Sequence, residues 1–236
     1  MWVMYLLLDE KGVDVLAIYI RGIKAFNLIW KKVLNMPLPK ENKIYTYADY
    51  IAWPENERIE LIDGQIYLMT SPSRTHQRIL GQLFYQFFDY LKDKSCEVYM
   101  APFDVRFPDG NEKDEENIKT VVQPDIVVVC DESKLDEKGC TGAPDLIIEI
   151  ISPSTAQKDK LHKFNLYEKY GVKEYWIVEP ENKILSVFIL QDNERYGRPD
   201  IYTQDDKVKV SIFEDLVIDL KTVLIWIETD TVENFV

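Results

Sequence analysis

The chain has 236 residues, of which 46% are hydrophobic and 12% aromatic, enough to bury one sizeable core and far from a disordered composition. Its formal net charge of −13 argues against a surface generally basic enough to bind a polyanion. A simple DNA-binding module is therefore disfavoured, and any contact with nucleic acid would need a local basic patch or a metal ion.

The first 35 residues differ from the rest in charge, since they contain five Lys or Arg and only three Asp or Glu. The opening MWVMYLLL is too short to span a bilayer and lacks the basic start and cleavage site of a signal peptide. We expect no membrane segment and a cytoplasmic location. We also expect an N-terminal extension over residues 1–35, whose place in the native domain stays open, followed by one globular domain over residues 36–236.

The cysteines Cys96, Cys130 and Cys140 form no CxxC pair and follow no framework spacing. In a chain of this kind such cysteines indicate reduced thiols in a cytosolic protein rather than disulfides or a zinc site. We therefore expect all three to be packing residues.

The organised pattern begins after Met36. Thr46, with Asp49 three residues later, is a typical N-cap for a short helix. Two apolar runs within residues 59–69 then flank Asp63-Gly64, one of the strongest short-range signals of a β-hairpin. The next segment should be a strand pair.

From Ser73 to about Lys92 the apolar residues recur with the i, i+3, i+4, i+7 spacing of a helix with one buried face. His76 falls on that face, near the start of the helix. The apolar positions are Ile79, Leu80, Leu83, Phe84, Phe87, Phe88 and Leu91.

The second half of the chain predicts more strands and one more helix. Residues 96–107 and 121–130 each have the composition of a strand. A helix is expected from Ser154, as N-cap, to Tyr170, with Gly171 as its C-cap glycine. Further strand-like runs follow, so the order of elements predicts an α+β domain with a mixed or mostly antiparallel sheet.

The stretch PDLIIEIISPS carries Glu149 in the middle of an apolar run. Such a run, closed by a Ser/Pro/Ser turn signal, is typical of a central strand covered on both faces. A buried carboxylate without a partner costs several kcal/mol or takes up a proton, so Glu149 should have a cation, a metal or a donor beside it.

Asp125 stands directly before another apolar strand run. Two carboxylates on neighbouring strands can converge on one Mg²⁺, which prefers a few carboxylates and its own waters. Lys163, near the start of the helix after Glu149, could orient the attacking water and offset phosphate charge. These residue types in this order suit phosphodiester hydrolysis.

Each of these residues also has an ordinary structural interpretation. Either acid could lie at a strand end, where it reaches solvent or caps a loop amide, and Lys163 could form an i, i+4 pair with Asp159. His76 alone is more typical of a satisfied core histidine than of a catalytic group. Glu60, which alternates with apolar neighbours, should by default point to water.

The ordered motifs ERIELIDGQIYLM, SPSRTHQ, APFDVRF, QPDIVVV, PDLIIEIISPS and KDKLHKFNLYEKYGVKEYWIVEP closely resemble the Uma-two family of restriction endonucleases in the PD-(D/E)XK nuclease superfamily. The resemblance covers about Met36 to the C-terminus. It implies a restriction-endonuclease-like αβββαβ core, with a mixed sheet flanked by helices, and metal-dependent phosphodiester hydrolysis. Asp125 and Glu149 match the two motif acids, and Glu60 and His76 match further positions that border the cleft.

One departure concerns the motif lysine, which in the superfamily lies two residues after the glutamate. Ile151 occupies that position here. Families of this type can supply the lysine from the following helix, and Lys163 is the matching residue.

Two functions of different classes follow from these observations. The first is an endonuclease for DNA that depends on Mg²⁺, or on Mn²⁺, with Asp125 and Glu149 as metal ligands and Lys163 positioning the water; a homodimer would suit cleavage of both strands. The alternative is an inactive nuclease-fold module for binding or assembly, which the acidic balance and the displaced lysine favour. Convergence of the three side chains in one cleft would favour the enzyme.

Overall fold

The computed structural model describes residues 4–8, 14–18, 43–53, 58–110, 114, 117–151 and 158–225, without the side chains of 4–8, 14–18 and 158–160. The chain forms two compact units, Met1–Glu41 and Asn42–Val236. In the first unit β1 (Met4–Leu8) and β2 (Asp14–Ile18) pair as an antiparallel hairpin. The second unit contains all the candidate site residues.

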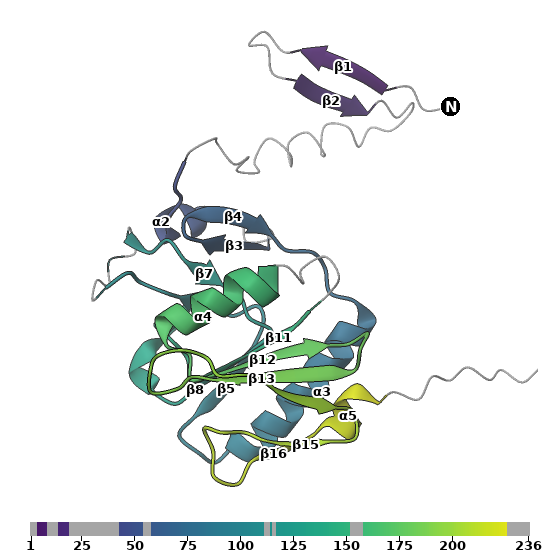
Figure 1. The fold of residues 1–236 in the computed structure, drawn as a ribbon. Helices are drawn as coiled ribbons and strands as arrows, with labels where there is room; N and C mark the ends of the chain where they lie inside the picture. The colour runs from purple at the N-terminus through teal and green to yellow at the C-terminus, as the bar shows by residue number, and fades with distance from the viewer. Residues whose placement is uncertain are drawn as a thin grey trace, which may run out of the picture. The chain divides into compact units, whose positions relative to one another are not determined.

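A six-stranded mixed sheet lies at the centre of the second unit, with strand order β14-β13-β12-β11-β8-β5 (Figure 1). Strands β11 and β12 are parallel, and the other neighbours are antiparallel. The strands are β5 (Glu97–Met100), β8 (Ile126–Val129), β11 (Leu146–Ile150), β12 (Glu174–Glu179), β13 (Ile184–Ile189) and β14 (Asp200–Thr203).

Two helices cover opposite faces of this sheet. Helix α3 (Arg74–Leu91) packs with Ile126 and Ile148 in one apolar cluster, whereas α4 (Phe164–Tyr170) packs with Val127 and Ile147 in another. Since alternate residues of a strand point to opposite faces, the two clusters lie on the two sides of the sheet. The chain order α3, β5, β8, β11, α4, β12 is the expected αβββαβ core, so the predicted fold class is confirmed.

A second sheet, of order β4-β3-β7-β6-β10-β9, packs against the same face of the central sheet as α4. Its first hairpin turns where the sequence predicts, at Asp63 (φ 49°) and Gly64 (φ 76°). Only residues that tolerate a left-handed conformation suit both positions of such a turn. The strands are β3 (Ile59–Ile62), β4 (Gln65–Leu68), β6 (Val105–Arg106), β7 (Val121–Val122), β9 (Leu135–Asp136) and β10 (Gly139–Thr141).

The two long strands predicted over residues 96–107 and 121–130 are each divided between the two sheets. In the first, Pro102 follows a cis peptide bond between β5 and β6. In the second, Pro124 lies between β7 and β8, and proline cannot donate a ladder hydrogen bond. Asp125 therefore lies where the chain crosses from one sheet to the other, directly before β8.

Helix α3 matches its predicted span, and the Ser73 hydroxyl accepts a hydrogen bond from the N–H of His76 (3.1 Å). Phe88 is an exception on its apolar face because it is 52% exposed. Gly171 ends α4 with φ 82°, as expected of a C-cap glycine. Ser154 lies outside the described residues. The remaining elements are α2 (Tyr47–Tyr50), η2 (Glu132–Lys134), η3 (Lys158–Lys163), β15 (Lys207–Lys209), β16 (Val217–Asp219) and α5 (Leu220–Leu224).

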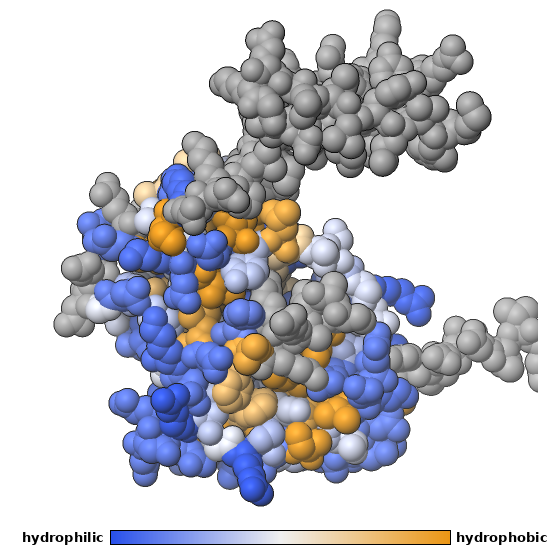
Figure 2. Space-filling model, turned by 45° about the horizontal axis from the view of Figure 1, so that its top comes forward, coloured by the Kyte–Doolittle hydropathy of each residue, from blue (hydrophilic) through white to orange (hydrophobic). Residues whose placement is uncertain are grey.

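Among the described residues, no helix has the length and apolar character needed to cross a membrane. On the face seen in Figure 2, hydrophilic residues alternate with places where hydrophobic residues reach the surface. Over the described surface as a whole, exposed large hydrophobic residues include Leu68 and Leu161.

Glu174, at the start of β12, fixes the segment before β16 to the central sheet. One carboxylate oxygen accepts from the Trp176 indole (2.7 Å), and the other accepts from the N–H of Ser211 (2.8 Å) and of Ile212 (3.3 Å). Burial raises the pKa of Glu174, although these hydrogen bonds act in the opposite direction. This buried carboxylate thus has hydrogen-bond partners of its own, and none of those named here is a candidate catalytic residue.

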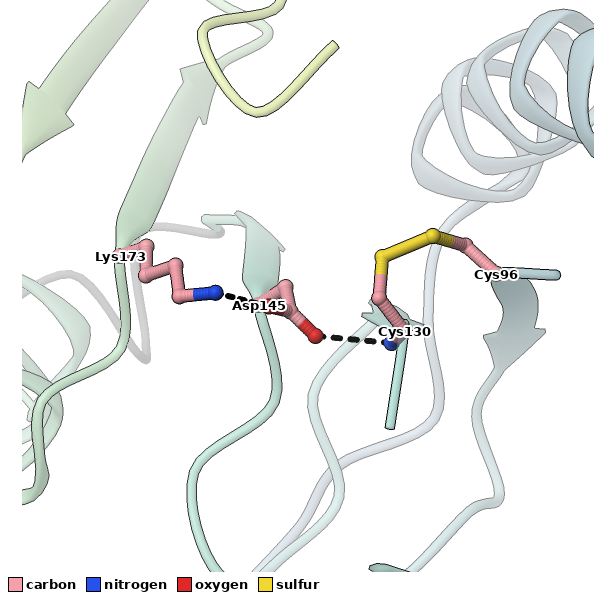
Figure 3. The surroundings of a disulfide bond; sticks show 4 residues. All are labelled: Cys96, Cys130, Asp145 and Lys173. Atoms are coloured by element: carbon pink, nitrogen blue, oxygen red, sulfur yellow. Dashed lines mark hydrogen bonds and ion pairs between the residues drawn. A yellow bond between two sulfur atoms is a disulfide. The ribbon is translucent and has the colours of Figure 1, made fainter. Parts of the chain in front are cut away.

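Two of the three cysteines form a disulfide, so the expectation of reduced thiols is wrong for Cys96 and Cys130 (Figure 3). They flank the Glu97–Val129 pair of the β5–β8 ladder, which brings together residues 34 apart in sequence. Spacing rules for neighbouring cysteines cannot detect a pair created by strand pairing. Asp145 lies beside the disulfide and accepts from the N–H of Cys130 (2.7 Å). Cys140 is free and buried, as expected of a packing residue.

Removing this disulfide with the Cys96→Ser and Cys130→Ser changes together should lower the free energy of unfolding by about 2–4 kcal/mol, because the bond restricts the unfolded chain. Urea unfolding with and without reductant would measure the effect. Reductant should destabilise the wild type and leave the double variant unchanged. Three free thiols in the denatured, unreduced wild type would contradict the prediction.

Candidate active site

Lys163 lies at the centre of a buried polar cluster between α4 and the two sheets. Its ammonium is 2.8 Å from Glu149 Oε1 on β11 and 2.8 Å from Glu60 Oε1 on β3. Glu149 Oε1 also accepts from the Tyr167 hydroxyl (2.7 Å), and Glu60 Oε1 accepts from the N–H of Gln123 (3.0 Å). The side chains of Lys163, Glu60 and Glu149 are at most 5% exposed, so the partner sought for Glu149 is a lysine and a tyrosine.

Asp125 lies beside this cluster at the entry to β8. Its Oδ2 accepts from the N–H of Ile150 (2.7 Å), the residue after Glu149, and contacts His76 Nε2 at 3.1 Å. Extending the β8–β11 register from Ile126↔Ile148 by one residue brings Asp125 opposite Glu149. Residues opposite each other in an antiparallel pair point to the same face, so Asp125 and Glu149 are neighbours across the two strands.

His76 Nδ1 is buried and has no hydrogen-bond partner within the described part of the chain. A carboxylate only accepts hydrogen bonds. The contact between His76 and Asp125 is therefore a hydrogen bond only when Nε2 of His76 carries the proton. His76 thus lies in the first turn of α3 in contact with Asp125.

The default expectation for Glu60 is wrong. All four residues of β3 are buried, and Glu60 is fully so, because this strand has protein on both faces. The i, i+4 alternative for Lys163 cannot be assessed, since the side chain of Asp159 lies outside the described residues. Lys163 does, however, point into the site rather than to solvent.

Sequence reasoning missed Tyr167, and it missed Asp104 and Tyr50, which form hydrogen bonds with Gln123. The Gln123 amide donates to Asp104 Oδ1 (2.9 Å) and to the Tyr50 hydroxyl (3.1 Å), which itself donates to Asp104 (3.0 Å). Burial raises the pKa of Asp104 and of Tyr50. Tyr167 could have been found from its position four residues after Lys163, which places both on one helix face; Asp104 and Tyr50 carry no comparable signal.

Among the described residues, no three His, Cys, Asp and Glu side chains form a group that could hold a metal ion. A Mg²⁺ site does not require three, because this ion usually binds through one or two carboxylates and keeps several waters. Asp125 and Glu149 offer two hard oxygen ligands on adjacent strand ends. The residues present therefore fit the ion that the sequence suggests.

Comparison with known proteins gives two curated relatives, both uncharacterized proteins of Synechocystis sp. One is 31% identical over 135 residues, which cover 56% of this chain and 65% of the relative. The other is 25% identical over 142 residues, which cover 58% of this chain and 76% of the relative. The chain thus spans slightly less than two thirds of the first relative.

A crystal structure from Anabaena variabilis, described as a "putative nuclease", superposes with a TM-score of 0.61 and 21% identity, covering 76% of this chain and 97% of that one. This likeness shows the fold. The Uma2 family model, described as "Putative restriction endonuclease", matches residues 47–221. Because the matched residues make up most of the chain, the protein belongs to the Uma2 family.

Proposed function

We propose that the protein is an endonuclease that hydrolyses phosphodiester bonds in DNA and depends on Mg²⁺, which Mn²⁺ could replace. The proposal is carried by the contact between Lys163 and Glu149, with Asp125 hydrogen-bonded to the backbone of the next residue. Lys163 contacts Glu149 directly (2.8 Å), and Asp125 binds the peptide N–H that follows Glu149 (2.7 Å). A protein that used this fold only for binding would have no need of this arrangement.

Each side chain has a defined task in the proposed reaction. Asp125 and Glu149 would hold the ion, which when bound supplies Lewis-acid stabilisation of the charge on the scissile phosphate. The Lys163 ammonium would orient the attacking water and offset phosphate charge. Glu60 and His76 would act indirectly. Glu60 would position Lys163, and His76 would position Asp125.

Hydrolysis adds one water across one phosphorus–oxygen ester bond. The water oxygen bonds to phosphorus, the ester bond to the leaving oxygen breaks, and a proton passes to that oxygen. Cleavage of DNA inside the cell would require a cytoplasmic location. Cutting both strands would need two sites, which a homodimer would supply by symmetry.

Nicking of supercoiled plasmid by protein freed of metal with EDTA would test the proposal. Nicked circles should form when Mg²⁺ or Mn²⁺ is added and should be absent when EDTA remains. Calorimetry would measure binding of the ion in parallel. Metal binding without cleavage of plasmid, single-stranded DNA or RNA would contradict the proposal and favour the alternative of a nuclease-fold module for binding or assembly.

A further inference from the structure

Tyr167 contacts the candidate metal ligand Glu149 through its hydroxyl (2.7 Å). It lies four residues after Lys163 on consecutive helical turns, which directs both side chains to one face. Both reach the same atom, Glu149 Oε1, at 2.7 Å from the hydroxyl and 2.8 Å from the ammonium. Two donors from one helical segment therefore converge on one carboxylate oxygen.

The Tyr167 hydroxyl can act only as a donor in this contact. A carboxylate oxygen has no hydrogen to donate, so the phenol O–H supplies the hydrogen of this bond. A hydrogen bond from a neutral hydroxyl to a carboxylate is among the stronger ones in proteins. It fixes the acceptor oxygen relative to the helix.

The ring of Tyr167 is itself held in place by the core. It packs edge-on against Tyr175, with ring centroids 4.9 Å apart, and lies 6.1 Å from the ring of Phe107. Tyr167 is fully buried in the cluster between α4 and the sheets. The hydroxyl is therefore presented to Glu149 by a side chain with little freedom to move.

We infer that Tyr167 is a positioning residue for the proposed nuclease reaction, whose hydroxyl orients the Glu149 carboxylate for binding the metal ion. This inference rests on the proposed function. Lys163 donates to the same oxygen and also contacts Glu60, which gives Glu149 one constraint. Tyr167 supplies the second constraint. Removing a residue that hydrogen-bonds to a metal ligand and orients it typically lowers metal affinity or activity by about 10–100-fold.

Tyr167→Phe tests the inference because it removes the hydroxyl and keeps the ring contacts. Tyr196→Phe is the matched control: Tyr196 lies in the same buried cluster, and its hydroxyl donates to the carbonyl of Val172 (2.9 Å), away from the site. Mn²⁺ affinity by calorimetry, plasmid nicking over a range of Mg²⁺ concentrations, and melting temperature should be measured for both variants and the wild type.

Tyr167→Phe should weaken Mn²⁺ binding and slow nicking by about 10–100-fold, and added Mg²⁺ should restore part of its rate. Tyr196→Phe should lower the melting temperature and leave metal affinity and rate unchanged. An active wild type with no difference between the variants in affinity or rate would overturn the inference alone. A wild type that neither binds the ion nor nicks DNA would overturn the proposed function and, with it, this role for Tyr167.

Discussion

Glu149→Gln is expected to slow plasmid nicking by about 10²–10³-fold and to abolish measurable Mg²⁺ binding. The loss of rate is of the order found when one electrostatic contact to a transition state is removed. The amide keeps the shape of the side chain, and its oxygen can still accept from Tyr167 and Lys163. It loses the negative charge that a divalent ion needs. Plasmid nicking and calorimetry on the same preparations would measure both effects.

Glu174→Gln provides the control for this change. Glu174 is also a buried glutamate, on the strand that pairs with β11, but its carboxylate binds Trp176 and Ser211. Its replacement should change the melting temperature and leave nicking and metal binding intact. If the two variants lost the same share of activity, Glu149 would be no more than a packing residue.

The central strand around Glu149 could be predicted because its apolar run and the turn residues that follow it both indicate a buried strand. An apolar run with one acid requires a buried partner for that acid, and the structure supplies Lys163 and Tyr167. Glu60 could not be predicted in the same way. The alternation of polar and apolar residues predicts that Glu60 faces solvent, but β3 is buried on both faces. Whether a strand is buried on both faces depends on how the second sheet packs.

The places where sequence reasoning failed depend on contacts between distant parts of the chain. Residues 96–107 have strand composition throughout, yet they serve two different sheets. The disulfide joins Cys96 to Cys130 because β5 and β8 pair in one particular register. Composition and periodicity report how a segment folds locally, whereas sheet membership and register depend on what packs against it.

Lys163→Met is expected to lower the free energy of unfolding by about 3–5 kcal/mol, the cost of removing one partner from a buried ion pair. The change takes away an ammonium that lies 2.8 Å from both Glu60 and Glu149. Methionine fills a similar volume, so the loss would reflect charge rather than a cavity. Urea unfolding of both proteins would measure the difference.

Adding Glu60→Gln to Lys163→Met should recover part of the lost stability, because it removes one of the two buried carboxylates that faced the lysine. The control is Lys173→Met, since Lys173 is 66% exposed and its buried partner Asp145 (2.6 Å) keeps the hydrogen bond from the Cys130 N–H (2.7 Å). This change should cost less stability than Lys163→Met, because water already solvates the lysine. Equal losses for the two lysines, or a double variant less stable than Lys163→Met, would contradict the prediction. Recovery of stability without recovery of nicking would separate two roles of Lys163. Its positive charge stabilises the fold by pairing with the buried Glu60 and Glu149, and the proposed reaction needs its ammonium beside Glu149.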